Sequence, residues 1–427
     1  MTLFGLSPKF PQSSENRESF SVSLSEAVLD SSSCDRARVS LPKQHRARFD
    51  ELRRGILAFC DEFHIPVSAL SNKATFEREL TSKKIPSPRM AEVVLLFQRL
   101  EYLLVHKEPL KEEPTESLEY AEQFYNLSEQ YEDQVNLLKD AGILDKDDAM
   151  TGIDGQKYPI PTLEQIAEHL CSPEQKEILR TKHDQGFTKL LLVPFGMSLT
   201  TLISLFKLFL LDYQHDHPDF SLDDNEPLWT REEVTQGIDM GDHPELVYFP
   251  KSYIEEEHQG KTKAQILKDQ TQDFDAVHGW RMLLLQSSDP GDPAKGIAPI
   301  PRENKREIRG KEMPRPDLKA DTISDEYLSS LVEAKDDPTS PYYYESGMTP
   351  EDWFVAFMTH LRETGQPLDN HRNGKDSIAH LTGSFFPRLV YAPSACWNED
   401  FHQAGLDLSP AGGHWNKGNG IRSSVAI

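Results

Sequence analysis

Histidine and cysteine are the side chains of this chain best suited to chemistry, and 15 histidines and 4 cysteines are present. His215-Asp216-His217 and the nearby His243 have the residue types of a metal cluster. A metal site also needs ligands that the fold brings together, and histidines in a polar loop are usually surface residues. We therefore predict no metal site and no cofactor.

The sequence contains no recognised catalytic motif: GxSxG, the P-loop, HExxH and the dinucleotide fingerprint are all missing. The acidic run Asp145–Asp148 lacks the glycine and the closing glutamate of a calcium loop. Cys396, beside Trp397, is a candidate nucleophile, but a reactive thiol needs a neighbouring base or cation that the sequence does not identify. The sequence favours binding over catalysis.

The segment 383–427 differs in composition from the rest of the chain. It is rich in Gly, Asn, Ser and aromatic residues, and Gly or Pro interrupts it every few positions, which excludes a long helix. Large apolar residues recur between the glycines: Phe385, Phe386, Trp397, Phe401 and Trp415. This mixture predicts short strands and ordered loops that present polar and aromatic groups, which is the physical form of a binding surface.

Alternating polar and apolar residues within this segment predict individual strands. The stretches 395–398, 403–408 and 421–427 alternate as half-buried strands do, and the glycines of 412–420 predict a loop between them. Because the last stretch is apolar, we expect it to lie inside the core sheet.

Trp397-Asn398, the Gly/Asn-rich loop and the run 419–425 (NGIRSSV) resemble the end of formylglycine-generating-enzyme-like C-type lectin folds. The resemblance is closer to the variable proteins of diversity-generating retroelements, which use this fold to display randomised side chains. KLLLVPFGMSL (189–199), Gly279-Trp280 and the helix after Thr349 are similar to the same group. The resemblance covers residues 186–427 and implies a variable-type segment at 394–427.

Site residues follow from this resemblance. It implies scaffold roles for Trp397, Gly420 and Arg422, with Arg422 donating to carbonyl groups that hold the loop. It implies a ligand-facing set of mixed chemistry, suited to adaptable recognition: Cys396, Asn398, His402, Asp407, Ser409, His414, Trp415 and Asn416. Alternatively, these residues form an ordinary surface. The catalytic formylglycine enzymes use paired cysteines, whereas this region has only Cys396, so the resemblance does not extend to oxidase activity.

The remaining elements give the domain organisation. Residues 1–40 are Ser-rich without apolar periodicity, which predicts disorder. Residues 41–183 predict an acidic α-helical region, with Phe49, Leu52, Ile56 and Phe59 at helical spacing. From 186 onwards, apolar runs at 189–194, 245–250 and 280–286 predict strands, 289–315 predicts an exposed basic loop, and a helix follows Thr349 and ends at Gly365. The predicted fold class is α+β, with a C-type-lectin-like domain at 186–427 after the helical region.

One segment, 190–211, is apolar enough to suggest a membrane span, since Lys207 is its single charge. Pro194 and Gly196 interrupt it, and Ser198 is a good N-cap for a helix that starts at Leu199. We predict a buried strand, a turn and a largely buried helix to about Asp212. A membrane anchor through 190–211 remains an alternative.

Charge and cysteine content limit the class of partner. The net charge of −24 argues against nucleic acid and anionic membranes as partners. Four scattered cysteines without a CxxC pair indicate neither a disulfide scaffold nor a zinc ribbon. The first residues lack the pattern of a secretory signal, so we expect a cytoplasmic protein.

Together these observations predict a non-enzymatic ligand-binding protein whose C-terminal face contacts a protein or glycan. The first alternative is an enzyme of the same fold that uses Cys396 or a histidine-bound metal. The second alternative is the membrane-anchored protein. The acidic helical region could also be the end that recruits a partner.

Overall fold

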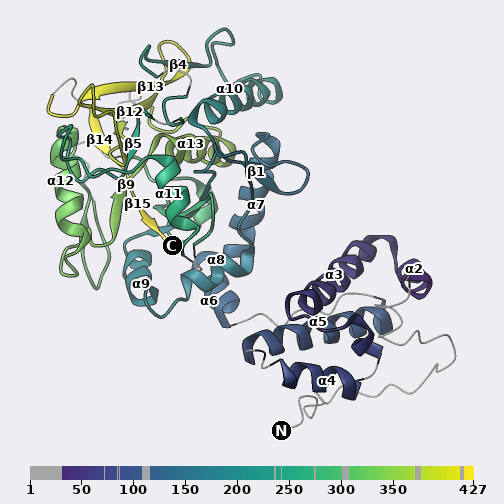
Figure 1. The fold of residues 1–427 in the computed structure, drawn as a ribbon. Helices are drawn as coiled ribbons and strands as arrows, with labels where there is room; N and C mark the ends of the chain where they lie inside the picture. The colour runs from purple at the N-terminus through teal and green to yellow at the C-terminus, as the bar shows by residue number, and fades with distance from the viewer. Residues whose placement is uncertain are drawn as a thin grey trace. The chain divides into compact units, whose positions relative to one another are not determined.

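The computed structural model describes residues 31–71, 73–83, 85, 87–107, 116–234, 237–241, 243–273, 276–300, 307–370, 377–413 and 418–427 (Figure 1). The chain divides into two compact units, Met1–Glu113 and Pro114–Ile427, and each has a hydrophobic core of its own. The predicted domain boundary, between 183 and 186, does not coincide with this division.

The N-terminal unit is helical. It contains α2 (Ser31–Val39), η1 (Lys43–His45), α3 (Arg46–Glu62), η2 (Val67–Ser71), α4 (Lys73–Ser82) and α5 (Ser87–His106). The predicted apolar stripe is the buried face of α3, which packs against α5. Helix α2 corrects the prediction of disorder over residues 31–39, because Cys34 and Ala37 give it an apolar anchor in the core of this unit. Residues 1–30 lie outside the described residues.

The C-terminal unit begins with helices that the sequence groups with the N-terminal region. They are α6 (Glu116–Tyr125), α7 (Leu127–Asp140), α8 (Leu163–Leu170) and α9 (Lys176–Asp184), with the hairpin of β1 (Ala149–Thr151) and β2 (Lys157–Pro159). Helix α7 shows why they belong here. Gln130 and Gln134, four residues apart, accept hydrogen bonds from the backbone amides of Leu190 and Leu192 at 2.8 and 3.2 Å. These amides lie on the edge of a sheet, so α7 satisfies groups that would otherwise invite pairing with another chain.

That sheet has four antiparallel strands in the order β3 (Phe187–Val193), β6 (Arg281–Gln286), β15 (Ser423–Ala426) and β9 (Glu345–Gly347). Every residue of β3 is buried. Strand β15 lies between β6 and β9, which confirms the prediction that the final stretch lies inside the core sheet.

The apolar segment 190–211 forms a strand and then a helix, as predicted. Strand β3 ends at Val193, and α10 (Leu199–Asp216) starts after Ser198, whose hydroxyl accepts a hydrogen bond from the amide of Thr201 at 3.1 Å. Within the residues that the structure describes, no helix is long and apolar enough to cross a membrane.

A second sheet has five strands in the order β14 (Asn419–Ile421), β10 (Ile378–His380), β12 (Tyr391–Asn398), β13 (Gln403–Pro410) and β4 (Leu228–Thr230). Strands β12 and β13 form an antiparallel hairpin, while β14 and β4 pair in parallel with β10 and β13. Helix α13 (Pro350–Thr364) packs on the inner face of this sheet. It starts with the capping box of Thr349 and Asp352 and ends at Gly365 in the left-handed conformation, which confirms the predicted limits.

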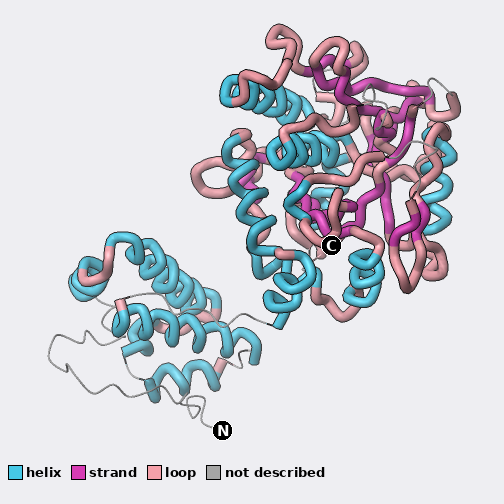
Figure 2. Tube along the Cα trace, turned by 180° about the vertical axis from the view of Figure 1, so that it is seen from behind, coloured by secondary structure: helices cyan, strands magenta, loops and turns pink. Residues whose placement is uncertain are grey.

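The other elements are short: α11 (Lys263–Gln270), η3 (Pro293–Lys295), α12 (Ser324–Lys335), the pair β5 (Val247–Tyr248) and β11 (Ser384–Phe385), and the pair β7 (Ile308–Arg309) and β8 (Arg315–Pro316). Seen from behind, helices flank the strands of the C-terminal unit on both sides (Figure 2). This mixture of helices with separate, mostly antiparallel sheets agrees with the predicted α+β class. The predicted exposed loop 289–315 is wrong in two places, since Ile297 and Ile300 are buried in the main core and Arg315 is buried in β8.

Candidate ligand-binding groove

The β12–β13 hairpin separates core side chains from outward side chains by strand alternation. Ala395 and Trp397 of β12, and Ala404 and Leu406 of β13, are at most 3% exposed and belong to the main core. The residues between them point to the opposite face, because successive side chains of a strand alternate. The registered pairs on that outer face are Asn398 with Gln403, Cys396 with Gly405, and Ser394 with Asp407.

One row of residues crosses the outer face of all five strands. Trp229 of β4 is in register with Gly405, and Gly405 is in register with Cys396. Next to Cys396, β10 contributes Ile378, which is in register with Asn419 of β14. Segments nearly two hundred residues apart in the chain therefore meet along one line on the sheet.

This row forms the floor of an open groove with a volume of about 550 Å³. Its lining also includes the carboxylates Asp223 and Glu226, the aromatic Phe401, and the hairpin residues on either side of the row. The volume lies in the range of about 300–1,000 Å³ that is usual for ligand sites.

Gly405 keeps the middle of the groove open. A Cβ atom at this position would meet only the carbonyl oxygen of Cys396, at 3.9 Å, so neither a clash nor an unusual φ requires glycine here. The missing side chain instead leaves space between Trp229 and Cys396, which are in register with it on either side.

Helix α12 covers the other end of this face. The hydroxyl of Ser324 lies 2.9 Å from the Nδ1 atom of His380. Leu328 belongs to the same buried cluster as Ala392 of β12. Burial lowers the pKa of His380 to about 4. The histidine is therefore neutral at neutral pH, and it lies under α12 and not in the lining of the groove.

Beneath the groove, the three predicted scaffold residues are buried. Trp397 is 3% exposed, and its ring lies 5.3 Å from that of Phe220 and 6.0 Å from that of Phe357. At Gly420, a Cβ atom would come within 2.3 Å of the Ile300 side chain, so only glycine fits.

Arg422 holds two loops together. Its guanidinium donates to both carboxylate oxygens of Asp369, at 2.9 and 3.0 Å, and to the carbonyl of Ala298 at 3.0 Å. A carbonyl partner is what the sequence predicts for Arg422, whereas the ion pair with Asp369 is not foreseen. Asp369 also accepts a hydrogen bond from the indole of Trp353, and its backbone carbonyl accepts one from the amide of Trp397. Arg422 thus fixes the loop to which Trp397 is attached.

The structure brings four of the predicted ligand-facing residues to the groove: Cys396, Asn398, Asp407 and Ser409. His402 lies beside it, exposed in the β12–β13 turn with a φ of 50°. His414, Trp415 and Asn416 lie outside the described residues. The binding role of the set stays a prediction.

Sequence reasoning missed the other side of the groove. Asp223, Glu226 and Trp229 come from the loop before β4 and from β4 itself, far from the glycine-rich tail. The acidic run 223–226, followed closely by a tryptophan, was the available signal. A parallel strand pairing between β4 and β13 could not be read from it.

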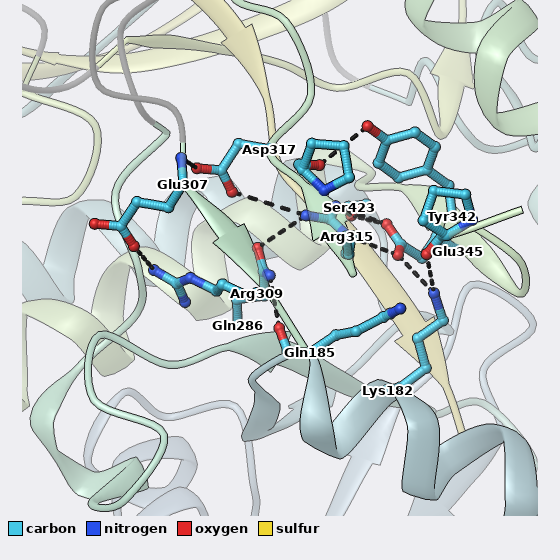
Figure 3. Close-up of polar contacts among 12 residues, drawn as sticks. Lys182, Gln185, Gln286, Glu307, Arg309, Arg315, Asp317, Tyr342, Glu345 and Ser423 are labelled. Carbon is cyan, nitrogen blue, oxygen red and sulfur yellow. Dashed lines mark hydrogen bonds and ion pairs between the residues drawn. The ribbon is translucent and has the colours of Figure 1, made fainter. Parts of the chain in front are cut away.

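A second polar cluster has a structural role (Figure 3). Glu345 of β9 accepts two hydrogen bonds from Arg315 at 2.8 Å each, one from Lys182 at 2.7 Å and one from Ser423 at 2.6 Å. Burial alone would raise the pKa of Glu345, but Arg315 and Lys182 outweigh it and hold that pKa below its usual value. The adjoining cavity is only about 20 Å³, too small for a ligand.

His215, His217 and His243, which the sequence suggests as possible metal ligands, do not form a metal centre. The ring of His217 stacks on Tyr213 with 4.1 Å between centroids. The described part of the chain contains no group of three or more His, Cys, Asp or Glu side chains placed to hold a metal ion.

Comparison of the chain with protein-family models, curated proteins and solved structures found no match.

Proposed function

We propose that the C-terminal unit is a ligand-binding module and that its groove takes a protein or glycan. The observation that carries the proposal is the open groove of about 550 Å³ on one face of the five-stranded sheet, with Trp229 and Phe401 left 38% and 62% exposed at it. Large exposed aromatic groups beside polar side chains are typical of binding surfaces.

The groove is attached to a stiff support. Its outward side chains alternate with core residues, and the strands beneath are fixed by the buried Arg422–Asp369 pair and by α13. A preorganised surface loses less conformational entropy on binding than a mobile one. A rigid support beneath the groove and chemically varied side chains on its outer face are the properties that a recognition surface requires.

We further propose that the fold of this unit is C-type-lectin-like, of the formylglycine-generating-enzyme type, and that the chain is a variable protein of a diversity-generating retroelement. Outward positions on β12 and β13 that can change without disturbing the core support this proposal. Sibling sequences test it: substitutions should concentrate at the outward positions of 396–416, while Trp397, Gly420 and Arg422 stay fixed. Substitutions spread evenly along the sequence would contradict the proposal.

A groove-filling variant tests the binding role directly. Gly405→Leu places a side chain in the middle of the groove without a backbone clash, and Gly291→Leu makes the same change at an exposed turn outside the segment 394–416, where a Cβ meets only the side-chain oxygen of Asp289 at 3.3 Å. The wild type and both variants are applied to an array of immobilised peptides and glycans. Gly405→Leu should lose the bound set of ligands, and Gly291→Leu should keep it. Equal binding by all three proteins, or no binding by the wild type, would refute the proposal.

The enzyme alternative rests on Cys396, whose side chain lies on the groove floor. No histidine is among the described residues that line the groove, where the titratable groups besides the thiol are the carboxylates of Asp223, Glu226 and Asp407. Cys396→Ser should therefore bind array ligands within about twofold of the wild type, because a hydroxyl replaces a thiol of similar shape. A covalent ligand adduct, seen by intact mass in the wild type and lost in Cys396→Ser, would favour the enzyme.

A further inference from the structure

Among the residues that the structure describes, the lining of the groove carries negative charge without a matching cation. Asp223, Glu226 and Asp407 line it, and no lysine or arginine is among the lining residues that the structure describes. Arg231 approaches from the side, but its Nη1 atom lies 3.4 Å from Asp407 and its Nε atom 3.0 Å from Glu233. Two carboxylates therefore already share this arginine. Asp223 accepts hydrogen bonds from the backbone amides of Asn225 and Glu226 through its Oδ1 atom, but neither Asp223 nor Glu226 has an ion-pair partner among the described residues.

The aromatic groups at the groove suit the same kind of ligand. The indole of Trp229 and the ring of Phe401 are both exposed and both line the groove. The face of an aromatic ring attracts a cation, and tryptophan does so most strongly. Carboxylates and ring faces together favour a positive group that has an apolar stem.

The polar atoms of the groove lining favour the same kind of ligand. Asn419 is 8% exposed, and among the described residues its Oδ1 atom has no hydrogen-bond partner. That atom is itself buried, so the acceptors that a ligand in the groove meets are the carboxylates. Ammonium and guanidinium groups only donate hydrogen bonds, which fits a lining of carboxylates.

We propose, on the basis of the ligand-binding role argued above, that the groove binds a lysine or arginine side chain presented by a partner protein. The volume of about 550 Å³ exceeds what one side chain fills, so a short peptide segment enters with its cation between Trp229 and the carboxylates. The net charge of −24 adds a long-range attraction that speeds the approach of a basic partner.

A glycan is the competing ligand, because sugar rings also stack on tryptophan. Sugar hydroxyls are neutral, however, and would leave Asp223 and Glu226 without a counter-charge. The excess of carboxylates therefore favours the cation.

The test uses the full-length protein on an array that carries varied capped peptides, the same peptides with acetylated lysines, and neutral oligosaccharides. Wild-type binders should be enriched in lysine and arginine, and acetylation should weaken them about fivefold or more, since it removes the charge and the cation–π donor. The strongest peptide then serves as the probe in calorimetric titrations.

Two matched charge variants locate the binding site. Glu226→Gln removes a carboxylate from the groove, and Glu256→Gln removes an exposed one from the loop 254–258 of the same unit. Dissociation constants should rise about two- to fivefold for Glu226→Gln and stay unchanged for Glu256→Gln, as expected for one partly exposed ion pair. Trp229→Ala should weaken the peptide about fivefold.

The outcomes separate this inference from the proposed function. If only oligosaccharides bind and Gly405→Leu abolishes their binding, the cationic ligand is wrong while the groove keeps its role. Equal weakening by Glu226→Gln and Glu256→Gln would mean general attraction to an acidic protein, which also overturns the inference. If Gly405→Leu leaves every binder unaffected, both proposals fail.

Discussion

Removing Arg422 should destabilise the C-terminal unit more than any surface charge does. In Arg422→Met, Asp369 stays fully buried and loses both bonds from the guanidinium, and Trp353 is the one donor among the described residues that its side chain keeps. Breaking a buried pair by removing one partner costs about 3–5 kcal/mol, because a charge is left without compensation. Since domains are stable by about 5–15 kcal/mol, the loss is a large share of the total.

Tryptophan fluorescence measures this loss in the relevant unit alone. All five tryptophans lie between residues 229 and 415, within the C-terminal unit. With a urea m-value of about 3 kcal/mol/M, a cost of about 4 kcal/mol lowers the unfolding midpoint by about 1.3 M. The matched control is Arg362→Met, which breaks the exposed pair of Arg362 with Asp140 (40% and 65% exposed) and should cost about 0–1 kcal/mol.

A double variant checks the cause. Asp369 has a φ of 57°, which asparagine tolerates, and Asp369→Asn removes the charge while keeping an acceptor for Trp353. Arg422→Met with Asp369→Asn should therefore be more stable than Arg422→Met alone by about 1 kcal/mol or more. If Arg422→Met shifts the midpoint no further than Arg362→Met, or if the second substitution adds further loss, the argument about a stranded charge is refuted.

Three further predictions use the same fluorescence assay. Gly420→Val should lower the midpoint strongly, since its Cβ meets Ile300 at 2.3 Å, and a midpoint near that of the wild type would show that the strand can move aside. Gln134→Met should cost about 1–3 kcal/mol because it leaves the β3 edge amide unpaired, and a smaller loss would mean that another group replaces it. Burial lowers the pKa of His360 and His380 to about 4 from the ordinary 6.5. Because these histidines bind protons at a higher pH in the unfolded chain than in the folded one, the stability of the fold decreases as the pH drops from 6.5 towards 4. Each histidine should remove about 2 kcal/mol between pH 7 and pH 5, and His380→Gln should show about half the wild-type loss; an unchanged pH slope would contradict the assignment.

Local patterns in the sequence predicted the elements that position the groove. Period-two alternation gave the hairpin strands at 395–398 and 403–408, and the caps at Ser198 and Thr349 gave the starts of two helices. These signals depend only on neighbours in the chain, so no tertiary contact was needed to interpret them.

Features that depend on distant segments were not predictable in the same way. The groove requires β4 to pair with β13 and β10 to pair with β12. The residues around Trp229 and Ile378 do not indicate which strand each of them pairs with. Arg315 looked like part of a solvated basic loop, because its partner Glu345 is thirty residues away. The sequence groups the helices α6–α9 with the N-terminal helices, because their contacts with β3 and the bond of Lys182 to Glu345 are made with distant parts of the chain.

Amide hydrogen exchange of the full-length protein, with and without the strongest ligand from the array, tests most directly the claim that the outer face of the β12–β13 hairpin is the binding surface. The account predicts that ligand-dependent protection is concentrated at residues 223–230 and 394–409, and that Gly405→Leu abolishes it. Protection confined to the helices of residues 31–107, or unchanged protection in Gly405→Leu, would contradict the claim.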